Sequence, residues 1–346
     1  MLLAAGPVIA PTGNLHPLLA WWALLFSGGL SGRLSSAPAD LGLRLVRDRL
    51  GLVRQFGPDK KTLRAQYGRA VCAVKLSGVA DSVRSGELRQ IDTSVAHVAR
   101  VYDYLLGGKD NFAADRDAGE KAIALLPEVV GVVKANRAFL VRAVRYLARE
   151  AGIRQFLDVG PGIPAADSTH QVAQEIAPAS RVVYADNDPV VILHARALLR
   201  SAPEGAIAFL DADLRDTGKI LAQAAQTLDF SQPVAVVLGA VLHFINGDAA
   251  YDITTSLMGA TVPGSYLAIS HVASDIASEI FGPVLEQANR LVAEKTYARS
   301  YDEVARFFAG LELVEPGVAA QCEWRPDSDL TVRHKSASWG GVARKP

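Results

Sequence analysis

The sequence predicts an α/β domain with an open, mostly parallel sheet of seven strands, helices on both faces and an antiparallel hairpin at its C-terminal end. Residues 156–162 (FLDVGPG) and 181–186 (RVVYAD) indicate a buried strand, a glycine turn, and a second buried strand that ends in a carboxylate. Residues 234–238 and 266–269 are apolar on both faces, which is the pattern of parallel strands covered by helices. Two further strand candidates lie close together near the C-terminus, as an antiparallel pair would.

The predicted elements follow one another in a regular order over residues 91–346. A helix through Val98 and Leu105 is expected to stop at Gly107-Gly108, because glycine favours the backbone conformation that ends a helix. Pro127 interrupts the next helical segment, and a long helix is predicted over 132–151. Beyond it, helical stretches alternate with predicted strands at 155–159, 181–185, 206–210, 233–239, 265–271, 311–315 and 338–343.

Length and composition leave room for one large domain and an extension. The chain has 346 residues, of which 50% are hydrophobic, and a formal net charge of zero, so no overall field attracts nucleic acid or an anionic membrane. Its two cysteines, Cys72 and Cys322, are far apart, which argues against a disulfide framework and a metal site. We expect a divergent N-terminal extension over 1–90 and a folded domain over 91–346, without a membrane segment in that domain, in a cytoplasmic protein.

The glycine turn on its own leaves two cofactor classes open. Gly160 and Gly162 let the backbone turn tightly and approach a ligand, so we expect both to contact the cofactor. Residues 160–165 also fit the G-x-G-x-x-A variant of the dinucleotide fingerprint, which makes an NAD-dependent oxidoreductase one alternative. Against it, Asp158 would repel a pyrophosphate, and Pro164 removes one of the N–H groups that would bind it.

Acidic residues lie at the ends of three successive predicted strands, at Asp158, Asp186 and Asp213. Asp186, with Asn187 beside it, can accept hydrogen bonds from both hydroxyls of a ribose. Asp213 can accept a hydrogen bond from the exocyclic amine of adenine, while the backbone N–H of Leu214 meets a ring nitrogen. With Asp158 facing a cationic tail, the three carboxylates would surround an adenosine that carries a sulfonium and an amino acid. That ligand is S-adenosylmethionine.

Five segments of the chain match a known pattern. They are 91–116, which contains YDYLLGGKDNF, 136–140 (NRAFL), 184–191 (YADNDPVV), 241–245 (VLHFI) and 340–346 (GGVARKP). Together they resemble a bacterial family of S-adenosylmethionine-dependent methyltransferases whose acceptor is largely unassigned, and the resemblance covers residues 91–346. It implies the Rossmann-like fold of class I methyltransferases. The chain departs from the family at Gly160-Pro161-Gly162, where Gly-Thr-Gly is usual, and at Ser168-Thr169-His170, where Asn-x-His is usual.

Residues 91–150 are expected to form a helical lid on a Rossmann-like core over 151–346. Gly107-Gly108 offers a hinge, and an aromatic side chain over the sulfonium would favour its positive charge. We therefore assign Tyr104 and Asn111, from the segment in which the family resemblance is densest, to cofactor binding. The alternative is an ordinary N-terminal helix that ends at a glycine.

Two histidines mark the expected acceptor side of the crevice. His243 follows the fourth predicted strand, where an acceptor would meet the methyl group, and we assign it as the candidate catalytic residue. His271, after the fifth strand, is the second candidate, and Arg299 lies in the region that would cover the acceptor pocket. Methyl transfer depends mainly on positioning, so a base is needed only if the acceptor loses a proton.

These observations predict an S-adenosylmethionine-dependent methyltransferase that acts on a small-molecule acceptor. Residues 91–346 contain no cluster of basic residues with interleaved aromatics, so nucleic acid is not expected as a partner. Two alternatives stay open, namely an NAD-dependent oxidoreductase and a non-catalytic protein that binds S-adenosylmethionine. The sequence does not predict the oligomeric state.

Overall fold

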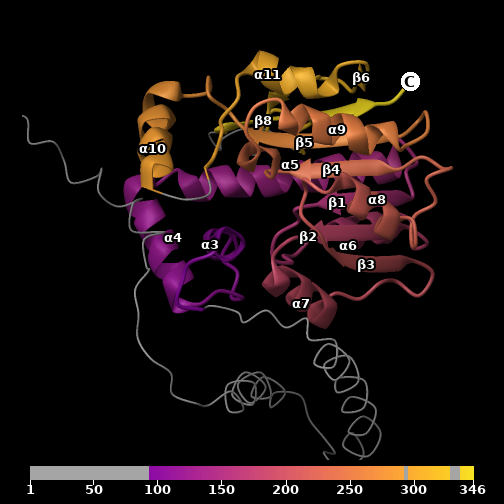
Figure 1. Cartoon of the computed structure of the whole chain (residues 1–346), viewed down its shortest axis with the longest axis horizontal. Coiled ribbons are helices and arrows are strands. Elements are labelled where there is room, and N and C mark those ends of the chain that lie inside the picture. Colours follow the sequence, from indigo (N-terminus) through magenta and orange to yellow (C-terminus); the bar gives the residue numbers. More distant parts are fainter. Residues whose placement is uncertain (1–92, 292–294, 328–335) are drawn as a thin grey trace, which may run out of the picture. The chain divides into compact units, whose positions relative to one another are not determined.

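The computed structural model describes residues 93–291, 295–327 and 336–346 (Figure 1). The predicted N-terminal extension, residues 1–90, lies outside the described residues. In chain order the described elements are α3 (Val98–Leu105), α4 (Ala113–Leu125), α5 (Val129–Arg149), β1 (Gln155–Val159), α6 (Thr169–Ile176), β2 (Arg181–Asp186), α7 (Pro189–Leu198), β3 (Ala206–Asp211), α8 (Thr217–Ala224), β4 (Ala235–Gly239), η4 (Leu242–Phe244), α9 (Ala249–Gly259), β5 (Tyr266–Val272), α10 (Ser278–Leu291), α11 (Tyr301–Ala305), η5 (Arg306–Phe308), β6 (Glu312–Leu313), β7 (Ala319–Ala320) and β8 (Ser338–Arg344).

The described strands form one sheet in the order β3-β2-β1-β4-β5-β8-β6, with the short β7 paired to β8. The strands from β1 to β5 are parallel to one another, while β8 is antiparallel to both of its neighbours, β5 and β6. β1 lies between β2 and β4, so the order of strands reverses at β1. In open parallel sheets, a ligand crevice forms at the carboxyl ends of the strands on either side of such a point.

The predicted fold class is confirmed, with one difference in the number of strands. The sequence predicts seven strands, whereas the described residues contain eight, because Ala319–Ala320 also pairs with β8. A strand of two residues is too short to show a period in the sequence. β6 and β8 form the expected antiparallel pair, although β7 comes between them in the chain.

Side-chain alternation along β1 decides which residues face which layer of helices. Leu157 and Val159 are buried in a core that includes residues of α8, α9 and η5. Phe156 belongs to the opposite core, which includes residues of α5 and α6. Because successive side chains of a strand point to opposite faces, Asp158 lies on the same side as Phe156, towards α5 and α6.

Proline and capping side chains mark where the helices begin and end. α4 ends at Leu125 and α5 begins at Val129, so Pro127 lies between two helices as predicted. At the start of α6, the Gln171 side chain accepts a hydrogen bond from Ser168 N (2.9 Å). At the start of α7, Asp188 accepts one from Val190 N (2.8 Å).

The first two described helices lie beside the edge of the sheet at which the parallel strands end. In Figure 1, α3 and α4 are at the left of the sheet, and the C-terminal end of the antiparallel β8 is at the right. α3 ends as predicted at Gly107, whose φ is 85° and whose N–H donates to Tyr104 O (2.9 Å). The N-terminal helices therefore stand at the edge where the crevice is expected.

Candidate active site

The glycine turn after β1 closely approaches the loop that follows β4. Gly160 and Gly162 have φ values of 72° and 66°, in the region that favours glycine. A Cβ atom on Gly160 would lie 2.5 Å from Val241 Cγ2, whereas a Cβ atom on Gly162 would meet no atom within 4 Å. Gly160 is thus required by packing between the two loops, and Gly162 faces open space.

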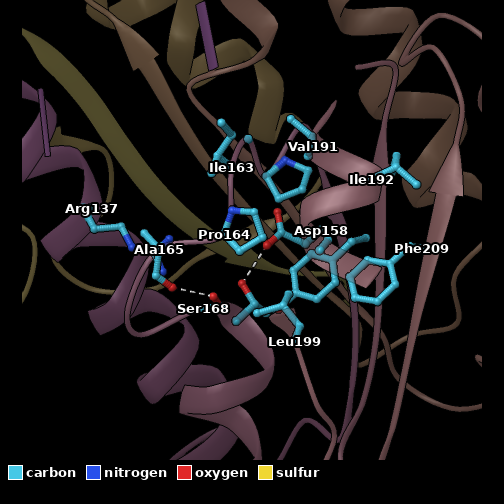
Figure 2. A pocket seen from close by; sticks show the side chains of 15 residues that line it. Arg137, Asp158, Ile163, Pro164, Ala165, Ser168, Val191, Ile192, Leu199 and Phe209 are labelled. Carbon is cyan, nitrogen blue, oxygen red and sulfur yellow. Dashed lines mark hydrogen bonds between the residues drawn. The ribbon is translucent and has the colours of Figure 1, made fainter. Parts of the chain in front are cut away.

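Asp158 is buried beneath this turn, on the α6 side of β1. Its carboxylate accepts a hydrogen bond from Thr169 Oγ1 (2.6 Å), at the start of α6. Burial raises the pKa of Asp158 to about 6. Asp158 and Gly162 line a hollow, together with Arg137, Thr169 and other side chains of β2, β3 and α7 (Figure 2). The structure therefore brings Asp158 and Gly162 together at one hollow.

Asp186 connects the glycine turn to the beginning of α7. Its two carboxylate oxygens accept hydrogen bonds from Gly162 N (3.2 Å) and Asp188 N (2.9 Å). Burial raises the pKa of Asp186, although these hydrogen bonds act in the opposite direction. Asn187, the next residue, is exposed. Asp186 and Gly162 are therefore in direct contact at the carboxyl ends of β2 and β1.

The two predicted adenine-binding residues lie in the turn after β3. The Asp213 carboxylate accepts a hydrogen bond from Arg215 N (2.8 Å) and forms an ion pair with Arg215 Nη1 (3.1 Å). Leu214 is buried. No hydrogen bond among the described residues joins either residue to Asp186, so their role in binding adenine stays a prediction.

Tyr104 and Asn111, the two predicted lid residues, make contacts within the α3–α4 segment. The ring of Tyr104 packs against Gly119 of α4, where a Cβ atom would lie only 2.2 Å from Tyr104 Cδ1. The Asn111 amide donates to Asp103 Oδ2 (2.8 Å) and to Gly108 O (3.1 Å). Their contact with the cofactor stays a prediction, as does the lid itself.

A buried chain of hydrogen bonds that the sequence analysis missed joins α3 to the sheet. Tyr102 Oη donates to Val133 O (3.1 Å) and accepts from Asn136 Nδ2 (2.7 Å). Asn136 Oδ1 in turn accepts from Ser270 Oγ of β5 (2.6 Å) and from Gln321 Nε2 (2.9 Å). A buried asparagine within the otherwise apolar face of a long helix was the available signal.

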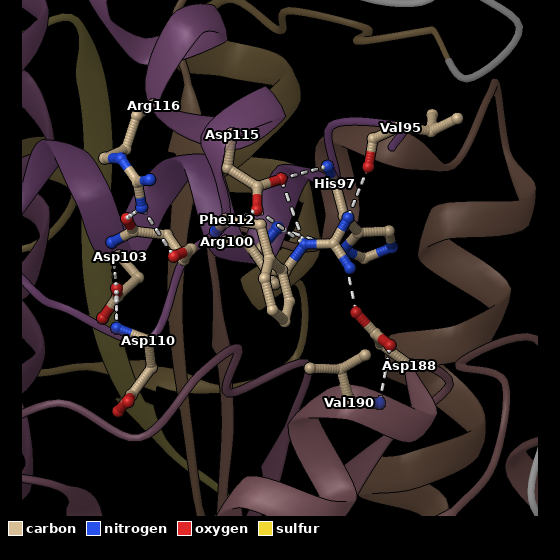
Figure 3. Close-up of polar contacts among 12 residues, drawn as sticks. Val95, His97, Arg100, Asp103, Asp110, Phe112, Asp115, Arg116, Asp188 and Val190 are labelled. Atoms are coloured by element: carbon tan, nitrogen blue, oxygen red, sulfur yellow. Dashed lines mark hydrogen bonds and ion pairs between the residues drawn. The ribbon is translucent and has the colours of Figure 1, made fainter. Parts of the chain in front are cut away.

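A second network joins α3 to the start of α7 (Figure 3). Arg100 Nε lies 3.0 and 2.9 Å from the two oxygens of the buried Asp115 carboxylate in α4. The same carboxylate accepts from His97 N (2.9 Å) and Phe112 N (2.8 Å). His97 Nδ1 lies 2.9 Å from Asp188 Oδ2. Although burial raises the pKa of Asp188, His97 and the Arg100 charge help to lower it below its usual value.

His243 lies in η4, directly after β4, and is 7% exposed. Burial lowers its pKa to about 3, and the neighbouring His271 and Arg299 add to this effect. Within the described part of the chain, the buried Nδ1 of His243 has no hydrogen-bond partner. The predicted catalytic histidine is therefore neutral near pH 7 and retains an unused polar atom.

Arg299 holds the loop that carries His243. Its Nη2 donates to Ile245 O (3.0 Å) and Gly247 O (3.0 Å), and its Nη1 to Leu242 O (3.3 Å). Arg299 Nη1 also lies 2.7 Å from His271 Nε2. Since arginine can only donate, His271 Nε2 accepts, and its Nδ1 carries the proton and donates to Val272 O (2.8 Å). His271 is thus a neutral partner of Arg299.

The backbone at the end of β4 is strained. Ala240 has a φ of 54°, which is unfavourable for a residue with a Cβ atom. Its N–H donates to Ser270 O (3.1 Å) and Ser270 Oγ (2.9 Å). The turn that leads to His243 is thus fixed by the hydrogen bonds that Ala240 N donates to Ser270 of β5.

Two other features have no candidate among the described residues. No group of three or more His, Cys, Asp or Glu side chains in these residues is arranged to hold a metal ion. In the same residues, no helix is both long and apolar enough to span a membrane.

The sheet order, the antiparallel β8 and the glycine turn facing a carboxylate on β2 define a Rossmann-like class I methyltransferase. The chain belongs to the S-adenosyl methyltransferase family, whose model matches residues 84–346. It is similar to the crystal structure of a DUF574 family protein from Streptomyces avermitilis, with 42% identity and a TM-score of 0.71 over 74% of this chain and 100% of that one. A putative methyltransferase from Thermobifida fusca shows 40% identity and a TM-score of 0.68 over 73% of this chain and 96% of that one. No curated protein matches the chain.

The enzyme is therefore an S-adenosylmethionine-dependent methyltransferase, and S-adenosylmethionine is its cofactor. Family membership favours this activity over an NAD-dependent oxidoreductase and over a non-catalytic binding protein. The residues at the glycine turn fit the cofactor, because Gly162 leaves open space and Asp186 is held beside it. When bound, the cofactor supplies an electrophilic methyl group on a sulfonium.

Proposed function

We propose that the enzyme methylates a small-molecule acceptor, with the cofactor lying across the carboxyl ends of β1, β2 and β3. The observation that carries this placement is the hydrogen bond from Gly162 N to Asp186 Oδ2 (3.2 Å). It holds the glycine turn and the carboxylate at the end of β2 at one point of the crevice. A ligand with a ribose next to an extended chain fits that arrangement.

Each predicted cofactor residue takes a part of the ligand in this proposal. Asp186 and Asn187 meet the ribose, and Asp213 and Leu214 meet the adenine. The remaining residues, Asp158, Gly160 and Gly162, support the methionine part, and Tyr104 and Asn111 belong to a lid over 91–150 on a core over 151–346. A chain that begins at residue 91 and binds S-adenosylhomocysteine as tightly as the full chain would show that residues 1–90 are dispensable for cofactor binding.

His243 is the candidate base if a small acceptor loses a proton, although its lowered pKa makes it a weak base. Its side chain is only 7% exposed and its Nδ1 is buried, so only a small hydroxyl or amine compound could approach the ring. The neutral imidazole can accept the acceptor's proton on a ring nitrogen while the acceptor's lone pair forms the new bond to the methyl carbon. The electrons of the broken carbon–sulfur bond remain on sulfur, so the cofactor leaves as S-adenosylhomocysteine.

Isothermal titration of S-adenosylhomocysteine into the Asp186→Ala variant tests the placement of the cofactor. Loss of two hydrogen bonds from the ribose to a carboxylate, at about 1.5 kcal/mol each, should weaken binding about 100-fold. Asp211, the neighbour of Asp186 in the β2–β3 register, is exposed and gives a matched control as Asp211→Ala. Unchanged affinity in Asp186→Ala, or an equal loss in both variants, would contradict the placement.

A further inference from the structure

Arg137 is a cation of α5 that lines the hollow beneath the glycine turn together with Asp158 and Gly162 (Figure 2). Its Nη2 donates to Ala166 O (3.0 Å) and to Asp167 O, in the loop between β1 and α6. In the sequence, Arg137 belongs to the NRAFL segment that resembles the family.

The guanidinium of Arg137 is only partly satisfied. Within the described residues, its buried Nε has no hydrogen-bond partner, and no carboxylate lies within ion-pair distance of it. Arginines that do pair with a described carboxylate are Arg100, Arg145, Arg215, Arg306, Arg325 and Arg344. An arginine that keeps a buried donor free beside a hollow is suited to an anionic ligand group.

The hollow therefore presents charges of both signs. Asp158 supplies a carboxylate from β1, and Arg137 supplies a cation from α5. The charge on Arg137 acts to lower the pKa of Asp158, although no ion pair joins the two side chains. Burial of Asp158 disfavours its charged form, and a cationic ligand group placed beside it would favour that form and pair with it. The two side chains thus match a ligand that itself carries both charges on neighbouring atoms.

The amino-acid end of S-adenosylmethionine carries an ammonium group and a carboxylate on the same carbon. We propose that Arg137 binds the carboxylate of this end, while Asp158 binds its ammonium group. The inference rests on the cofactor placement proposed above and adds a residue of α5 to it. It assigns Arg137 to recognition of the zwitterion, in addition to its hydrogen bonds to the 166–167 carbonyls.

A pair of ligands separates this role from a merely structural one. S-adenosylhomocysteine retains the amino-acid end, whereas 5′-methylthioadenosine has the same nucleoside and sulfur but no amino acid. In the full chain, Arg137→Gln should weaken S-adenosylhomocysteine at least 10-fold in isothermal titration and change 5′-methylthioadenosine less than 2-fold. Arg137→Lys should recover part of the loss, because the charge remains. Arg145→Gln, on the same helix, removes an exposed arginine that pairs with Asp327 and should change neither ligand.

Asp158→Asn provides the second arm, because its amide oxygen can still accept from Thr169 while the charge is lost. It should also weaken S-adenosylhomocysteine at least 10-fold and leave 5′-methylthioadenosine within 2-fold. An equal effect of Arg137→Gln on both ligands would show that Arg137 only holds the loop, and no effect on either would equally overturn the proposal. If the unaltered enzyme binds 5′-methylthioadenosine but not S-adenosylhomocysteine, the zwitterion site alone is wrong. If it binds neither, the cofactor placement is wrong as well.

Discussion

Two arginines near different parts of the carboxyl edge of the parallel strands are held in different ways. At the end of β4 and β5, Arg299 is 4% exposed and donates to three backbone carbonyls and to His271. At the end of β1, Arg137 is half-buried, donates to two carbonyls and keeps a buried Nε without a partner in the described residues. The first arginine completes the protein's own framework, whereas the second retains a donor for a ligand.

This difference separates residues that build the site from residues that bind. A buried group whose hydrogen bonds are all made within the protein contributes to stability, and its loss leaves several acceptors unsatisfied. A partly unsatisfied group that also lines a hollow can take its missing partner from a ligand. Substitutions on the β4–β5 side should therefore lower the free energy of unfolding most, and substitutions on the β1–β2 side should lower ligand affinity most.

The largest effect on stability is expected for Arg299→Met. The substitution leaves the carbonyls of Leu242, Ile245 and Gly247 and the acceptor nitrogen of His271 without their donor, which should cost about 4 kcal/mol of unfolding free energy. Urea unfolding measures this change. The exposed Arg306, paired with Asp248, serves as the control, and Arg306→Met should cost less than about 1 kcal/mol. Similar losses of stability in the two variants would show that the hydrogen bonds of Arg299 do not stabilise the fold.

A smaller effect is expected from the protonation of His243. Its folded pKa of about 3 lies below the unfolded value of about 6.5, so the unfolded chain binds more protons below neutral pH. Stability from this group is complete above pH 6.5 and is lost as the pH falls towards 3. Between pH 7 and pH 5 the unaltered enzyme should lose about 2 kcal/mol more than His243→Gln in urea unfolding. Equal losses would show that His243 titrates normally, since the other buried groups are common to both chains.

The smallest effect is expected at the strained end of β4. Ala240→Gly removes the Cβ atom from a residue with a φ of 54° and should stabilise the enzyme by about 1 kcal/mol. Ala268→Gly, inside the regular strand β5, is the matched control and should destabilise the enzyme by a similar amount. Thermal unfolding of both variants measures the difference. A loss of stability in Ala240→Gly would mean that no strain is held beside His243.

The fold could be predicted because its signals are local and periodic. The glycine turn, the apolar strands and the break at Pro127 each occupy a few consecutive residues. The structure confirms the sheet and the break, while the long helix predicted over 132–151 spans Val129–Arg149. The two residues of β7 gave no such signal, because their pairing with β8 depends on a distant strand. Local patterns therefore sufficed for the architecture but not for its shortest strand.

The site was only partly predictable. Asp158 and Asp186 lie near the carboxyl ends of β1 and β2, and Gly162 follows β1, so their position in the chain indicated their position at the sheet edge. Arg299 bonds to backbone carbonyls more than 50 residues away, and any residue type supplies a carbonyl, so the sequence carries no trace of those partners. Arg137 was part of a recognisable segment, but its unsatisfied Nε becomes visible only once the surrounding atoms are placed.

In the proposed placement of the cofactor, the contact between His97 and Asp188 couples cofactor binding to the position of α3. Asp188 follows the proposed ribose carboxylate by two residues, and its N–H already bonds to it (2.9 Å). Coupling between two binding equilibria is reciprocal. If the packing of α3 increases the affinity for the nucleoside, the bound nucleoside must stabilise the packing of α3 by the same free energy. Proteolytic cleavage just ahead of Val98 should then slow as the enzyme becomes saturated.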